Sequence, residues 1–256
     1  MCGVDNFQTI RVSDVGVLFS ITLNREKEKN GINRVMLDEI AQAIRKAEES
    51  TQCKIILIEG HKGFFSYGMD LEEVVEGKST ILDRDKNGGV GFFQILRSLI
   101  QSSKLVVSVI DGRALGGAVG LIAASDIAIS TQRSVFSLPE IRHGLIAANV
   151  SPFLIRKIGF AKTYKMALSA AILRANEAQQ IGLIDSICDD TRMAVAGIVE
   201  KFSFIDSDAI KRNKAYFNKL HPVNAHEENI AFLAIQSCLH DELVIERIRK
   251  NQQGVF

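Results

Sequence analysis

Two glycine-rich turns and one later glutamate are the features of this chain whose residue types and spacing could do chemistry. One turn, residues 111–120, follows the β-branched run 104–110, and the other lies within residues 64–73. Each turn comes after an apolar run and before a helix-like run, so its backbone N–H groups are open to a ligand. Such groups can hold a phosphate, a carboxylate or a developing oxyanion, and the motif alone does not choose among them.

The glycine spacing argues against a nucleotide site. Gly116, Gly117 and Gly120 do not fit G-x-G-x-x-G, and no Lys-Ser/Thr pair of a phosphate loop follows them. The glycines could serve only to bring a helix close to a sheet. Because a second glycine-centred turn is present, we favour a pair of backbone N–H donors that stabilises negative charge on a carbonyl oxygen.

Glu140 is the candidate for proton transfer. It follows Pro139 and precedes an apolar residue, Ile141. An acidic residue at a helix start can simply be a favourable partner for the helix dipole. Beside the two turns, however, it could move a proton at the carbon next to a thioester carbonyl. His143, three residues later, would face the same way on a helix, although a solvated or capping histidine is the alternative.

The elements that must position these residues alternate between strand and helix. Residues 9–23 predict a β-hairpin turning at Ser13–Asp14, Asn33 predicts the start of a helix, and residues 54–59 predict a buried strand. This alternation is typical of an α/β fold with parallel strands joined by right-handed crossovers. The composition of residues 77–91 predicts a loop over a site. Beyond about residue 191 only helices are expected, two of them separated by Pro222.

Composition limits the classes of partner. The net charge is +1, with 31 basic and 30 acidic residues, which provides no field for nucleic acid. The four cysteines form no C-x-x-C pair, so we expect neither a metal site nor a disulfide framework. No apolar run reaches the ~18 residues of a membrane span, and no signal peptide is evident. These features predict a cytoplasmic protein that binds neither nucleic acid nor membrane.

Several sequence blocks together resemble the crotonase superfamily of enoyl-CoA hydratases and isomerases. The blocks follow the order and spacing of that family over roughly residues 8–190: residues 24–30, 65–73, 112–120, 126–129, 136–140, 144–146 and 178–184. The resemblance implies a crotonase-like spiral of ββα turns, here residues 1–190 with the active site. It implies a C-terminal helical trimerisation region, residues 191–256, and assembly into homotrimers or hexamers.

The resemblance also implies a shared chemistry, in which two backbone N–H groups stabilise a thioester enolate. By position these groups belong to Met69 and Gly117, and Glu140 is the catalytic carboxylate. The neighbouring turn residues implied to bind substrate are Tyr67, Gly68 and Gly116. No cofactor is implied beyond the phosphopantetheine arm of CoA or of an acyl carrier protein, which carries the substrate. Arg25 and Lys29 are the candidates for contacting its phosphate.

One departure from the family pattern changes the expected reaction. Hydratases of the family resemble one another in carrying two glutamates; the second aligns with Glu140, but the first falls on Gly120. The family's double-bond isomerases use a single glutamate at the Glu140 position. Residues 125–130 and 151–159 resemble the dehydratases of polyketide β-branching cassettes, which also have glycine at the Gly120 position.

That narrower resemblance implies loss of water from 3-hydroxy-3-methylglutaryl on an acyl carrier protein, giving a 3-methylglutaconyl thioester. The distal carboxylate of this substrate needs a cationic or N–H-rich receptor, and the candidates are Arg142, His143 and Lys78. Two enzymatic alternatives remain, a Δ3,Δ2-enoyl-CoA isomerase and a general enoyl-CoA hydratase. A third alternative is a non-catalytic scaffold that binds acyl thioesters. In that case glycine at position 120, in place of a catalytic glutamate, would be a sign that activity has been lost.

Overall fold

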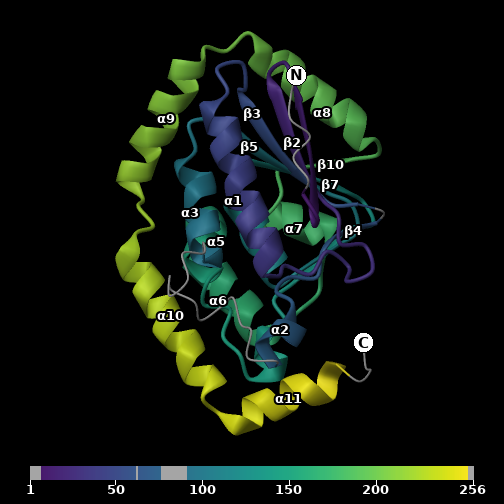
Figure 1. The fold of residues 1–256 in the computed structure, drawn as a ribbon, viewed down its shortest axis with the longest axis vertical. Helices are drawn as coiled ribbons and strands as arrows, with labels where there is room; N and C mark the ends of the chain where they lie inside the picture. The colour runs from purple at the N-terminus through teal and green to yellow at the C-terminus, as the bar shows by residue number, and fades with distance from the viewer. Residues whose placement is uncertain (1–6, 62, 76–90, 253–256) are drawn as a thin grey trace.

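The computed structural model describes residues 7–61, 63–75 and 91–252, and its centre is a six-stranded sheet (Figure 1). The strand order is β1-β2-β3-β5-β7-β10. β1 pairs antiparallel with β2 and every other neighbouring pair is parallel, which confirms the α/β prediction. The strands of this sheet are β1 (Ile10–Val15), β2 (Leu18–Leu23), β3 (Ile55–Glu59), β5 (Leu105–Ile110), β7 (Ile127–Thr131) and β10 (Ser186–Cys188).

A second, four-stranded sheet positions the site, and the sequence analysis did not predict it. Its order is β4-β6-β8-β9, and its strands are β4 (Phe64–Ser66), β6 (Arg113–Leu115), β8 (Val135–Ser137) and β9 (Leu173–Arg174). β4, β6 and β8 are parallel neighbours. Their carboxyl ends therefore meet at one edge, and these ends lead directly into the Tyr67 turn, the Gly116 turn and Glu140.

The N-terminal hairpin is present, but its predicted turn is wrong. Val15 pairs with Leu18, so the chain reverses at Gly16 and Val17 rather than at Ser13–Asp14. Gly16 has φ +60°, a conformation that a two-residue hairpin turn requires and that glycine adopts without strain.

Helices cover both faces of the large sheet. Along β3, Ile56 and Ile58 pack into the main core with α1 (Arg34–Glu49) and α3 (Phe92–Gln101). Ile55 and Leu57 face the other way, against α8 (Thr191–Ser203). This alternation explains why β3 reads as a continuous apolar run. The predicted start of α1 is confirmed, because the Asn33 side chain accepts a hydrogen bond from the Met36 amide.

The remaining helices include the short ones near the site and a C-terminal series. They are α2 (Leu71–Val75), α4 (Gly117–Ala123), the 3₁₀ helix η1 (Glu140–His143), α5 (Ser151–Ile158), α6 (Phe160–Ser169), α7 (Ala175–Ile181), α9 (Ser207–Leu220), α10 (Ala225–Leu239) and α11 (Glu242–Gln252). Pro222 separates α9 from α10 as predicted. Figure 1 shows α9, α10 and α11 running around the outside of the molecule. Among the described residues, no helix combines the length and the apolar character needed to cross a bilayer.

Candidate active site

The two glycine-rich turns lie against each other. A Cβ atom on Gly68 would stand 2.5 Å from the Leu115 carbonyl oxygen and 2.9 Å from the Gly117 nitrogen. Gly68 and Gly116 have φ +86° and +53°, which disfavour any residue with a side chain. Glycine is thus required both for the backbone conformation and for the close approach of the turns.

Met69 and Gly117 each have an unused backbone N–H in this arrangement. The main chain on either side of Met69 is fixed by Ile32, whose N–H donates to the Gly68 carbonyl (2.7 Å) and whose carbonyl accepts from the Asp70 N–H (2.9 Å). Gly117 is the first residue of α4, where an N–H has no intrahelical acceptor. Within the described part of the chain, neither the Met69 nor the Gly117 N–H donates a backbone hydrogen bond. Both are open to a ligand's carbonyl oxygen.

Glu140 brings a carboxyl group to these amides. Its Oε1 lies 3.2 Å from the position that a Cβ on Gly116 would take. Its Oε2 is buried and has no hydrogen-bond partner among the residues that the structure describes. Burial raises the pKa of Glu140 to about 7, because the charged form is poorly solvated there. The carboxyl can therefore accept or release a proton near neutral pH.

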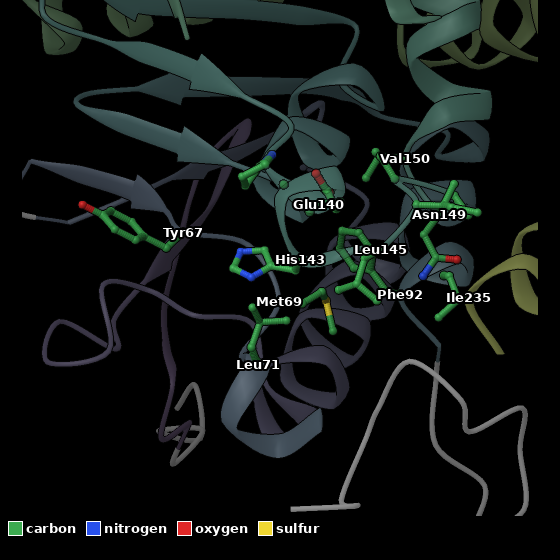
Figure 2. Close-up of a pocket in the computed structure, with 16 residues that line it drawn as sticks. Tyr67, Met69, Leu71, Phe92, Glu140, His143, Leu145, Asn149, Val150 and Ile235 are labelled. Atoms are coloured by element: carbon green, nitrogen blue, oxygen red, sulfur yellow. The ribbon is translucent and has the colours of Figure 1, made fainter. Parts of the chain in front are cut away.

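A pocket of about 670 Å³, counted with its open mouth, contains the amides and the carboxyl. Figure 2 shows its labelled side chains extending from Tyr67 on one side, past His143, Met69 and Glu140, to Val150, Asn149 and Ile235 on the other. Apart from Tyr67, Glu140, His143 and Asn149, the side chains that line it are apolar. Such an apolar pocket with a few polar groups is typical of a small-molecule site.

The three candidates for holding a substrate carboxylate are placed differently. His143 lines the pocket, and burial, followed by the charge of Arg142, lowers its pKa. Arg142 is exposed, does not line the pocket and donates to the Ala170 carbonyl at 3.1 Å. Lys78 lies outside the described residues. The structure thus brings His143, and not Arg142, to the site.

The predicted phosphate contacts lie near the Tyr67 side. Arg25 is largely buried and forms an ion pair with Asp70 (2.9 Å), which anchors the start of α2. The Lys29 ammonium lies 4.9 Å from the centre of the Tyr67 ring. Arg113, which the sequence analysis missed, donates to the Tyr67 hydroxyl at 3.0 Å. Phosphate binding by Arg25 and Lys29 stays a prediction.

Gly120 has no room for a side chain. A Cβ on Gly120 would stand 2.6 Å from Val150 Cγ1 and 3.0 Å from Leu96 Cδ1. The position that the resemblance aligns with the first glutamate of the hydratases is therefore filled by apolar packing, and Glu140 is the single carboxylate among the described pocket residues.

This packing predicts the effect of one added methyl group. We expect Gly120→Ala to lower the free energy of unfolding by about 1–3 kcal/mol through overpacking, and Val150→Ala to relieve part of that loss in the double variant. Gly197→Ala is the control, because Gly197 lies inside α8 with nothing within 4 Å of an added Cβ and should gain about 0.5–1 kcal/mol. Urea unfolding measures the free energy of unfolding of Gly120→Ala, Val150→Ala, the double variant and Gly197→Ala. Additive effects of the two neighbouring substitutions would contradict the contact.

Comparisons with known proteins show the family and the fold of this chain. The enoyl-CoA hydratase/isomerase family model matches residues 15–232. The bacillaene synthase dehydratase PksH of Bacillus subtilis is 26% identical over 98% of this chain and 93% of its own length. Human enoyl-CoA delta isomerase 2 is 27% identical over 88% of this chain and 59% of its own length.

The crystal structure of the Bacillus subtilis polyketide biosynthesis enoyl-CoA hydratase pksH shares the fold. It superimposes with a TM-score of 0.88 at 27% identity, covering 98% of this chain and all of that one. The predicted crotonase fold and the resemblance to polyketide dehydratases are thus confirmed. By its family match, its fold and its pair of amides beside one carboxylate, this chain belongs to the enoyl-CoA hydratase/isomerase family of the crotonase superfamily and is an enzyme of that type.

Proposed function

We propose that this enzyme removes water from a β-hydroxyacyl thioester carried by an acyl carrier protein, with 3-hydroxy-3-methylglutaryl as the acyl group. The observation that carries the proposal is a single buried carboxyl, Glu140, beside two open amides, with apolar packing where a second carboxylate would stand. The similarity to a bacillaene synthase dehydratase supports the choice of reaction.

The amides of Met69 and Gly117 would receive the thioester carbonyl oxygen. Removal of the α-proton places negative charge on that oxygen, and donors already in place stabilise it without reorganisation. In other enzymes one such donor contributes about 2.7–4 kcal/mol to transition-state stabilisation. The phosphopantetheine arm would approach from the Tyr67 side, where Lys29 and Arg113 provide positive charge.

Glu140 would then perform both proton transfers. Its carboxylate takes the α-proton, and the electrons of the Cα–H bond form the enolate. When the enolate collapses, the Cα=Cβ bond forms, the Cβ–O bond breaks, and the leaving hydroxyl takes the proton from Glu140 to depart as water. The carboxylate ends in the state in which it began, so no second carboxylate is needed.

This scheme predicts a pH dependence. The reaction starts from ionised Glu140, whose pKa is raised by burial to about 7. We therefore expect kcat/KM for dehydration to rise with pH and to level off above an apparent pKa near 7. Initial rates between pH 5.5 and 9 measure this profile. A rate that is flat, or that falls as pH rises through 7, would remove Glu140 as the base.

Isomerisation is the second candidate, because a Δ3,Δ2-enoyl thioester isomerase also needs one carboxylate and a human delta isomerase is 27% identical to this chain. The two reactions separate when the protein is offered a 3-hydroxy-3-methylglutaryl carrier-protein thioester and a 3-enoyl-CoA in parallel. Mass spectrometry detects the loss of water from the first, and ultraviolet absorbance detects conjugation in the second. Turnover of only the 3-enoyl-CoA would overturn the dehydratase proposal.

Assembly into a trimer or hexamer is part of the proposal. The outer surfaces of α9 and α10 expose large apolar side chains, among them Tyr216, Leu220, Ile230 and Leu233. Apolar surface of this kind is typical of a subunit interface. Light scattering on the purified protein measures the mass, and a monomer would contradict this part.

A further inference from the structure

Asn149 is a pocket residue that the sequence analysis missed. It lies on the opposite side of the pocket from Tyr67, beside Val150 and Ile235 (Figure 2). Phe92 completes an apolar wall around it. Among the described residues that line this side of the pocket, Asn149 has a polar side chain, whereas its neighbours Phe92, Val150 and Ile235 are apolar.

Among the residues that the structure describes, none forms a hydrogen bond with the side-chain amide of Asn149. The residue is partly buried. The Asn149 amide is not one of the buried atoms that lack a partner, so it is open to the pocket, and a polar group in an otherwise apolar wall is placed to pair with a ligand.

The backbone fixes where this amide stands. The Ser151 N–H donates to the Ala147 carbonyl (3.1 Å), and the Leu154 N–H donates to the Val150 carbonyl (3.0 Å). These bonds join the segment that carries Asn149 to the first turn of α5. The side chain is therefore presented by a defined turn.

The direction of the substrate follows from the charges around the pocket. The cationic groups near Tyr67 suit the phosphate of the carrier arm, and the Met69 and Gly117 amides suit the thioester oxygen. An acyl chain that continues away from Tyr67 reaches the wall of Phe92, Val150 and Asn149. Its distal end then meets the Asn149 amide.

We infer that Asn149 determines acyl specificity by donating a hydrogen bond from its side-chain N–H to a carboxylate oxygen at the distal end of the acyl chain. The inference rests on the proposed function for the direction of the substrate. A carboxylate accepts a charge-assisted hydrogen bond, which is about twice as strong as a neutral one. An acyl chain ending in a methyl group would leave the amide unpaired.

Three freshly prepared thioesters of pantetheine phosphate that carry no β-hydroxyl group, and so cannot lose water, test this assignment by binding alone. Glutaryl, pentanoyl and 5-hydroxypentanoyl chains have the same number of carbons and end in a carboxylate, a methyl and a hydroxyl group. Calorimetry on the full-length protein should show that glutaryl binds about 10- to 100-fold more tightly than pentanoyl. Equal affinities, or preference for the hydroxyl chain, would overturn the inference.

Two variants of Asn149 locate the effect. Asn149→Leu keeps the size and should remove most of the preference for glutaryl while leaving pentanoyl affinity within about threefold. Asn149→Asp should weaken glutaryl binding further by charge repulsion. Asn213→Leu, at an exposed asparagine of α9, is the control and should leave all three affinities unchanged. A Leu variant that keeps the glutaryl preference, or that weakens glutaryl and pentanoyl equally, would contradict a role for the amide.

Turnover of the hydroxymethylglutaryl thioester, measured separately, distinguishes failure of the inference from failure of the proposed function. Selective glutaryl binding that depends on Asn149, without any dehydration, would overturn only the reaction. Dehydration by a protein whose Leu variant still prefers glutaryl would overturn only the inference.

Discussion

Replacing Glu140 by glutamine is expected to slow dehydration of the thioester about 10²- to 10⁴-fold, because the amide keeps the size of the side chain but cannot exchange the proton. Carrier-protein thioester is mixed with excess enzyme, and loss of water is followed by mass spectrometry. Glu72→Gln, at an exposed residue of α2, serves as the control and should keep the parental rate. Near-normal turnover by a folded Glu140→Gln variant would remove Glu140 from the mechanism.

The same substitution has a second expected effect, on stability. The pKa of Glu140 rises from 4.5 to about 7 on folding, through burial. Below about pH 4.5 the carboxyl is protonated in both states, whereas through pH 7 and above ionisation favours the unfolded chain by up to about 3 kcal/mol. Glu140→Gln should therefore raise the melting temperature relative to the parent at pH 8 and raise it less at pH 5. A difference independent of pH would contradict the raised pKa.

Placing alanine at Gly68 is expected to lower kcat about 10²- to 10³-fold, comparable to losing one oxyanion donor elsewhere. The added Cβ would stand within 3 Å of both the Leu115 oxygen and the Gly117 nitrogen, so the two turns must separate. The Met69 and Gly117 amides could then no longer meet one oxygen. KM should change much less than kcat, because the lost interaction strengthens in the transition state.

Gly182→Ala provides a control for backbone strain. Gly182 has φ +83°, close to that of Gly68, but nothing lies within 4 Å of an added Cβ. Both alanine variants should lose stability through the strained conformation, and only Gly68→Ala should lose kcat. Equal loss of kcat in both would show that strain, rather than displacement of the amides, controls activity.

The main elements of the fold were predictable from the sequence because they depend on local patterns. The apolar strands, the Asn33 cap and the break at Pro222 each follow from residue types over short stretches. The polar pair Ser13–Asp14 favours a turn, yet the positive φ available to Gly16 decides the position of the hairpin turn. The small sheet was missed because its strands are only two or three residues long, too short to show a period.

The site was predictable to the extent that it depends on backbone. Met69, Gly117 and Glu140 follow the ends of three adjacent parallel strands, so a resemblance in their turns was enough to bring them together. The direction of a side chain was not predictable in the same way. Arg142 lies only two residues from Glu140 but donates to Ala170, and Asn149 faces the pocket although its sequence context is apolar.

The backbone that carries the Met69 amide is held by hydrogen bonds among residues that do not line the pocket. Asn30 adopts φ +55° and donates to the Phe65 carbonyl at 3.1 Å, while Ser66 Oγ donates to the Asn30 carbonyl at 2.7 Å and accepts from the Gly68 N–H. Residues that touch an acyl chain can consequently be exchanged without shifting the donor. Descendants of such a protein could acquire new substrates through a few wall substitutions and inherit the proposed enolate chemistry unaltered.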